Sequence, residues 1–174
     1  MENSVPGNEV WCVVGTGQSL KVEDLEYVRG KCRVLLISNA YTLAPWADVL
    51  VSHDSNWWNR NRAAFKFSGK KYSRFEFPNV KKFNPPGFPR GCNSGLMGIL
   101  VARSLGAKKI ILLGFDMHGT HYFGKHPQGL KNTTPERFGV HIRQFTKFPD
   151  CEIINCTPNS SLKVYLKAEL RETL

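Results

Sequence analysis

The chain has no long apolar segment. Its 174 residues are 41% hydrophobic and 22% charged, and no run approaches the roughly 20 apolar residues that a membrane-spanning helix needs. The first residues, Met1–Ser4, have neither the basic charge nor the apolar core of a secretory signal. We therefore expect a cytoplasmic protein without a membrane span.

Paired cysteines are absent, and the five cysteines of the chain are irregularly spaced. Disulfide-stapled proteins and zinc-binding domains carry paired cysteines at fixed spacings, whereas this chain has no C-x-x-C pair. We expect reduced thiols that pack as small hydrophobic side chains where they adjoin apolar runs. The five cysteines are Cys12, Cys32, Cys92, Cys151 and Cys156.

Internal repeats and low-complexity segments are also absent from the sequence. A chain of this length buries about two-thirds of its unfolded surface when it folds around one core. The sequence therefore predicts a single domain spanning residues 1–174.

Acidic residues are nearly missing between residues 59 and 90, where nine lysines and arginines are opposed only by Glu76. Seven aromatic residues are interleaved with these cations, a mixture typical of surfaces that bind single-stranded nucleic acid. The same charge would also suit a phosphorylated small molecule, an acidic glycan or a well-solvated surface. We predict a basic, aromatic-rich insertion here, with nucleic acid as an alternative partner.

Apolar segments at strand spacing and at helix spacing alternate along the chain. The segment 110–113 is apolar throughout, which is typical of a parallel strand covered on both faces. Strands separated by helices favour the same arrangement. The predicted fold is α/β, a doubly wound, mainly parallel, Rossmann-like sheet. Its expected strands are 10–14, 33–38, 48–52, 72–77, 109–113 and 152–155, and its expected helices are 22–29, 94–105, 135–147 and 161–170.

The first expected strand ends in the glycine-rich segment 15–20, Gly-Thr-Gly-Gln-Ser-Leu. Glycines between a strand and a helix let a phosphate approach the backbone, and amides at the helix start favour an anion. The dinucleotide fingerprint G-x-G-x-x-G would need a glycine where Leu20 stands. The segment therefore predicts the phosphate or ribose edge of a mononucleotide site, with an ordinary strand-to-helix turn as the alternative.

Polar residues follow each expected strand and precede the helix expected from residue 94. Ligands of parallel sheets bind outside the carboxyl ends of the strands. Asp54, close to two tryptophans, suits a ribose or pterin-like ring, and Asn93 or Ser94 suits a helix cap that also faces an anion. The expected nucleotide-binding residues are Gly15, Thr16, Gly17, Ser19, Asn39, Asp54, Asn93, Ser94, Gly95, Tyr122, Asn159 and Ser160.

The segment 116–126 holds one aspartate and three histidines. Histidine has the pKa that a general base needs near neutral pH. The spacing matches no common zinc pattern, so we expect no metal site and interpret these histidines as stacking groups or as a base. The expected catalytic residues are His126, His118 and Asp116, whereas His141, between apolar neighbours on a helix, is expected to be structural.

In order along the chain, these motifs resemble two Rossmann-like groups. One is the bacterial sialyltransferases that use CMP-sialic acid, whose G-N-G-P-S-L loop is similar to residues 15–20 and whose T-S-G is similar to 93–95. Their L-G-x-x-x-I-x-L-x-G-x-D and C-P-N-S segments are similar to residues 105–116 and 157–160. The other group is the hydroxymethylpterin diphosphokinase-like domains, and small phage-borne proteins of unassigned activity also look similar.

The resemblance implies a pocket for a nucleotide or a nucleotide-sugar such as a CMP-sugar donor, with no further cofactor, and transfer of a group from that donor. Thr16 and Gln18 depart from the sialyltransferase loop, and the chain lacks most of the lid that carries the catalytic histidine of those enzymes. Two alternatives stay open: a module that binds a nucleotide without turning it over, and a nucleic-acid-binding protein that uses residues 59–90.

Overall fold

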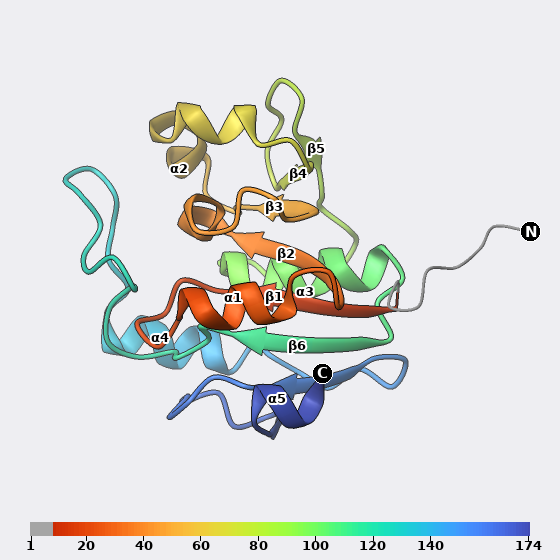
Figure 1. The fold of residues 1–174 in the computed structure, drawn as a ribbon. Helices are drawn as coiled ribbons and strands as arrows, with labels where there is room; N and C mark the ends of the chain where they lie inside the picture. Colours follow the sequence, from red (N-terminus) through yellow and green to blue (C-terminus); the bar gives the residue numbers. More distant parts are fainter. Residues whose placement is uncertain (1–8) are drawn as a thin grey trace, which may run out of the picture.

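One eight-stranded sheet forms the centre of the protein, and all its strand pairs are parallel (Figure 1). The computed structural model describes residues 9–174. The strand order is β5-β4-β3-β2-β1-β6-β7-β8, which confirms the predicted α/β, doubly wound, Rossmann-like fold. The strands are β1 (Val10–Val14), β2 (Arg33–Ile37), β3 (Val49–Val51), β4 (Lys70–Ser73), β5 (Lys81–Lys82), β6 (Lys109–Leu113), β7 (Glu152–Asn155) and β8 (Leu166–Lys167).

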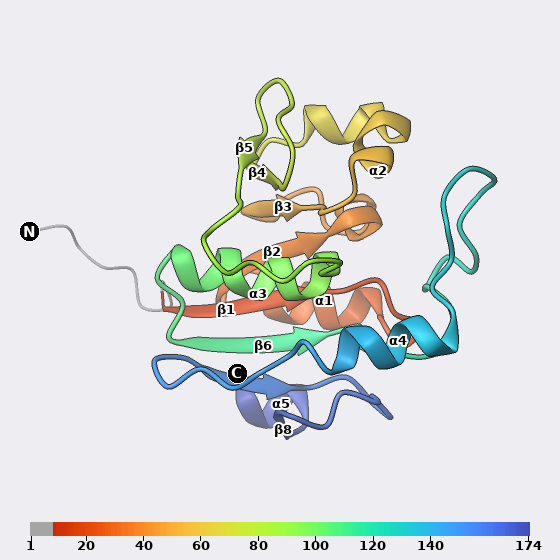
Figure 2. The same ribbon diagram turned by 180° about the vertical axis from the view of Figure 1, so that it is seen from behind.

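Helices cover both faces of the sheet. The face seen in Figure 1 carries α1 (Val22–Val28), α2 (Ser55–Arg60) and α5 (Leu170–Thr173). The opposite face, seen in Figure 2, carries α3 (Ser94–Ser104) and α4 (Pro135–Ile142). Two 3-10 helices, η1 (Ser38–Thr42) and η2 (Arg62–Lys66), follow β2 and α2. Within residues 9–174, no helix combines the length and the apolar character of a membrane span.

Two hydrophobic cores sandwich the sheet, which explains why its central strands are apolar throughout. Side chains along a strand point alternately to the two faces. Val13 therefore packs into the core under α3, whereas Cys12 and Val14 pack into the core under α1. Helix α3 lies close to the strands at Gly98, where a Cβ would come within 2.5 Å of the Ile37 side chain.

The strand order reverses at β1. The chain moves from β1 to β2 on one side, and β6 later pairs with β1 on the other side. Loops at such a reversal diverge above the carboxyl ends of the two strands and leave a crevice, where parallel sheets bind their ligands. In this protein the loops in question are residues 15–21 and 114–134.

Three expected elements differ from the observed ones. The expected strand 72–77 begins and ends earlier in the structure, as β4 (Lys70–Ser73). Tyr72 and Ser73 are both buried in it, and β4 and β5 extend the sheet at one edge. The expected helix 161–170 is replaced by a loop and β8, because pairing with β7 overrides local helix propensity. The expected helix 135–147 ends at Ile142, after which Phe145 turns into the core.

Candidate functional site

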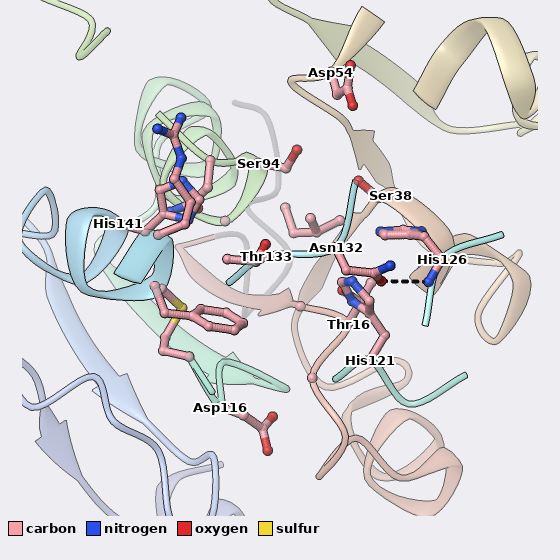
Figure 3. A pocket seen from close by; sticks show the side chains of 18 of the residues that line it. Thr16, Ser38, Asp54, Ser94, Asp116, His121, His126, Asn132, Thr133 and His141 are labelled. Atoms are coloured by element: carbon pink, nitrogen blue, oxygen red, sulfur yellow. Dashed lines mark hydrogen bonds between the residues drawn. The ribbon is translucent and has the colours of Figure 1, made fainter. Parts of the chain in front are cut away.

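A cavity of about 840 Å³ opens at the carboxyl edge of the sheet, beside the ends of β1 and β6 (Figure 3). Its volume lies in the range of roughly 300–1,000 Å³ that is usual for small-molecule sites. All five histidines of the chain line it. Eleven of the predicted site residues also line it: Gly15, Thr16, Gly17, Asn39, Asp54, Asn93, Ser94, Gly95, Asp116, His118 and His126.

The other four predicted residues, Ser19, Tyr122, Asn159 and Ser160, are not among the residues that line the cavity. Ser19 donates to Asp116, and Tyr122 donates from its hydroxyl to the Asn39 carbonyl over 2.8 Å. Ser160 is fully buried and donates to the Phe115 carbonyl, while Asn159 accepts a hydrogen bond from His118. The structure thus places these four side chains or carbonyls in contacts that hold the loops together.

The glycines of the first loop serve close packing against the loop after β6. A Cβ on Gly15 would lie 2.5 Å from the Gly114 carbonyl oxygen, and one on Gly17 would lie 1.8 Å from Asp116 Oδ2. The amides of Gly15 and Gly17 donate to Leu113 and Gly114 carbonyls. These amides are therefore engaged within the protein, and the glycine requirement of this loop follows from packing of two backbones.

Asp116 anchors the first loop from the opposite side. Its buried carboxylate accepts hydrogen bonds from the Ser19 amide (3.1 Å) and the Ser19 hydroxyl (2.8 Å). In Figure 3 it lies at one end of the labelled group, away from Asp54 at the other end. Both carboxylate oxygens already have partners, so the geometry gives Asp116 an architectural role in the cavity wall.

The start of α3 offers side-chain hydrogen-bond donors to the cavity. Asn93 is the N-cap, and its Oδ1 accepts from the Leu96 amide over 2.9 Å. The Asn93 Nδ2 is buried without a hydrogen-bond partner among the described residues. Ser94 Oγ accepts from the His53 amide over 2.9 Å, which leaves its proton for a ligand. This end of the cavity is therefore rich in hydrogen-bond donors.

Cationic side chains surround the same end of the cavity. The Arg137 guanidinium lies beside Gly91, 3.2 Å from where a Cβ would be. Arg74 contacts His53 Nε2 at 3.3 Å, and burial of the ring, followed by the charge of Arg74, lowers the pKa of His53. Burial and Arg137 likewise lower the pKa of His141. Lys125 and Lys131 add positive charge elsewhere in the lining.

A cluster of stacked rings forms the wall between the first loop and residues 120–126. His121 Nδ1 lies 2.7 Å from Thr16 Oγ1, and the ring stacks on Phe123 with centroids 4.8 Å apart. The His126 ring lies 4.3 Å from it, and the His126 amide donates to Asn132 Oδ1. Burial lowers the pKa of His121 to about 4 and also lowers that of His126. Both rings are thus neutral at pH 7.

Another part of the cavity wall comes from the segments that follow β2 and β3. It contains Asn39, Asp54 and Trp57. Trp57 Nε1 donates to Asn39 Oδ1 over 2.7 Å, which fixes the amide of Asn39. Asp54 caps α2 by accepting from the Asn56 amide. Ser38, next in the lining, has a left-handed φ of 46°. Such backbone strain in a non-glycine residue is common at binding sites.

The sequence did not single out several lining residues. His121 belongs to the histidine-containing segment 116–126, but only the fold shows that its ring contacts the Thr16 hydroxyl. Arg137 is on α4 and reaches the cavity because α4 crosses the carboxyl edge, which no local pattern signals. His141, expected to be structural, also lines the cavity.

The aromatic residues of the basic stretch are mostly absorbed by the two cores. Phe67 and Tyr72 are buried, and four others pack partly buried against the cores. Only Phe75 among the seven has an exposed side chain, at 45%. Base stacking needs exposed ring faces, so this stretch presents cations without a row of stacking platforms. The packed rings are Phe65, Phe67, Tyr72, Phe77, Phe83 and Phe88.

Metal-binding geometry is not found in residues 9–174, where no three histidine, cysteine or carboxylate side chains are grouped to hold an ion. Cys92 lines the cavity, but burial raises the pKa of its thiol to about 12, so it stays protonated. A protonated thiol is neither a metal ligand nor a nucleophile. The polar groups of the cavity are therefore amides, hydroxyls, imidazoles, cations and the carboxylates of Asp54 and Asp116.

Comparison with family models, with curated proteins and with solved structures finds no match to this chain. The resemblance to sialyltransferases and to the pterin diphosphokinase-like domains therefore stays an expectation drawn from the motifs. The cavity itself is the basis on which a function is proposed below.

Proposed function

We propose that the cavity binds a nucleotide or nucleotide-sugar through its phosphate, and that the protein transfers a group from that donor. The observation that carries the proposal is the buried, unpartnered Asn93 Nδ2 at the start of α3. A buried donor without a partner costs about 1–3 kcal/mol, which a bound acceptor would recover.

The phosphate would lie at the start of α3 rather than in the first loop. The amides of Ser94 and Gly95 precede the first helical hydrogen bond, which runs from the Met97 amide to the Asn93 carbonyl. The positive end of an 11-residue helix and the Arg137 guanidinium both favour an anion there. Anion binding therefore fits this corner better than the engaged amides of Gly15 and Gly17.

The rest of the donor would extend along the carboxyl edge. From the start of α3 the lining continues to Ser38, Asn39 and Trp57 on one side and to the neutral imidazoles on the other. The volume of about 840 Å³ accommodates a nucleotide with an attached sugar. The neutral rings supply hydrogen-bonding and proton-accepting groups at pH 7 without adding charge.

The decisive variant is Asn93→Asp. Aspartate keeps the oxygen that caps α3 and is as good an N-cap as asparagine, but it replaces the free donor with a negative oxygen. We expect the melting temperature to be unchanged and the affinity for CMP, measured by isothermal titration calorimetry, to fall at least tenfold. Unchanged affinity would refute the placement of the phosphate.

Arg137→Gln and Arg143→Gln form a matched pair on the same helix. Arg137 lines the cavity, whereas Arg143 at the end of α4 is exposed and outside it. We expect only Arg137→Gln to weaken CMP binding. Equal effects of both variants would show that net charge, and not a site, governs the binding.

A nucleotide-binding module without turnover is the alternative within the same cavity. Incubation of the protein with CMP-sialic acid separates the two. Release of CMP above the uncatalysed rate supports transfer, with water as the simplest acceptor. Binding of CMP-sialic acid with no release would make the protein a binding module.

A further inference from the structure

Thr16 and His121 are distant in sequence but form one hydrogen-bonded pair. Thr16 Oγ1 lies 2.7 Å from His121 Nδ1, and the two residues are 105 positions apart. Both line the cavity. A hydroxyl bound to one imidazole nitrogen fixes the ring orientation and determines which nitrogen is left for a ligand.

Backbone contacts hold the pair in register. The Tyr122 amide donates to the Thr16 carbonyl over 2.8 Å, and Gly17 forms an antiparallel bridge with His121. The His121 amide and carbonyl also exchange hydrogen bonds with Gly124. Both ends of the pair are thus fixed by main-chain contacts.

The surroundings keep the His121 ring neutral. Phe123 covers one face, and the His126 ring lies beside it. Burial is the main cause of its lowered pKa, the charge of His126 lowers the pKa further, and an interaction with the Thr16 backbone raises it. No carboxylate is among these groups. The Nε2 atom has no protein hydrogen bond in the part of the chain that the structure describes.

We propose that Thr16 and His121 work as a pair in which Thr16 Oγ1 accepts a hydrogen bond from His121 Nδ1–H, so that the free Nε2 of His121 takes the proton of the hydroxyl that attacks the donor. This inference rests on the proposed function. His121 is then the catalytic base and Thr16 its positioning residue. The sequence motifs favour His126 as the base instead. The buried Nδ1 of His126 has no hydrogen-bond partner in residues 9–174, so no hydroxyl orients its ring as Thr16 orients His121.

The transfer is a displacement at the anomeric carbon of the donor sugar. A bond forms between the acceptor oxygen and the anomeric carbon of the donor sugar, while the bond from that carbon to the phosphate oxygen breaks. The electron pair of the broken bond leaves with the nucleoside phosphate. The proton of the acceptor hydroxyl moves to His121 Nε2, and the resulting imidazolium loses it to solvent.

Tautomer measurement by long-range ¹H–¹⁵N NMR tests the pair without any turnover. We expect the His121 ring to carry its proton on Nδ1, and its pKa to lie near 4 and to rise when CMP, an anion, binds. A proton on Nε2 in the free and CMP-bound protein would overturn the proposal. If CMP does not bind at all, the proposed function fails, while the tautomer of the free protein still reports on the pair.

Variants at Thr16 separate positioning from packing. Thr16→Val keeps the shape but removes the hydroxyl, and we expect CMP release from CMP-sialic acid to slow about 10- to 100-fold, with KM little changed. Thr16→Ser should retain most of the rate, and His121→Gln should lose it as Thr16→Val does. The control is Thr146→Val, at an exposed position outside the cavity. A Thr16→Val enzyme with the wild-type rate and pH profile, or CMP binding without any release by the wild type, would overturn the role.

Discussion

Gly17→Ala tests how the first loop is built. The Cβ of alanine would lie 1.8 Å from Asp116 Oδ2 and 2.7 Å from the Gly114 carbonyl oxygen. Ordinary contact begins near 3.4 Å, so the carboxylate would have to retreat by about 1.6 Å. Such a movement breaks the hydrogen bonds from the Ser19 amide and hydroxyl, which measure 3.1 and 2.8 Å.

The expected loss of stability follows from the two hydrogen bonds between Ser19 and Asp116. Hydrogen bonds to a charged group contribute about 1.5–3 kcal/mol each, so loss of both in Gly17→Ala should destabilise the protein by about 3–6 kcal/mol. For a chain of this size, such a loss lowers the melting temperature by roughly 6–24 °C. Urea denaturation followed by circular dichroism measures the free energy of unfolding directly.

Gly139→Ala is the matched control. Gly139 lies within α4, and its Cβ would meet only Arg143 Nη1 at 3.6 Å, an ordinary contact. Alanine is the better helix former by about 1 kcal/mol, so this variant should be unchanged or slightly stabilised. If Gly17→Ala is as stable as Gly139→Ala, the tight packing of the two loops is refuted.

Two further predictions concern the loops around the cavity. Folding lowers the pKa of His121 to about 4. Between about pH 6.5 and 4 the unfolded chain therefore binds a proton that the folded protein does not, and the free energy of unfolding falls as the pH is lowered. After allowance for solvent screening of the half-buried ring, the free energy of unfolding should drop by about 1–2 kcal/mol between pH 7 and 5, and a loss of the same size in His121→Gln would contradict this. Tyr122→Phe removes the hydroxyl bound to the Asn39 carbonyl and Thr42 and should cost about 1 kcal/mol. Its affinity for CMP should stay within about threefold of wild type, and a larger loss would place Tyr122 in the site.

The sheet was predictable because its signals are local. The continuous apolar run 110–113 specifies a buried parallel strand, and a glycine, Gly106, with a left-handed φ of 98°, follows the end of α3. The last segment was not predictable in the same way. The pairing of β8 with β7 is a long-range contact, and it replaces the helix that local spacing favoured.

The sequence indicates where the cavity lies but not its details. The rule that ligands meet the carboxyl ends of parallel strands points to this edge of the sheet, and eleven of the fifteen predicted residues line the cavity there. The sequence could not show that the amides of Gly15 and Gly17 are engaged, nor that Thr16 meets His121, because both depend on how two distant loops pack. Arg137 was missed since its helix lies far along the chain from the motifs.

Isothermal titration of the wild type and of Asn93→Asp with CMP and with CMP-sialic acid determines whether the cavity holds a nucleotide phosphate. We expect saturable binding of one ligand per chain to the wild type, and at least tenfold weaker binding to an equally stable Asn93→Asp. No binding of either compound to the wild type, or equal affinity of the two proteins, would contradict the claim that this cavity holds a nucleotide phosphate at the start of α3.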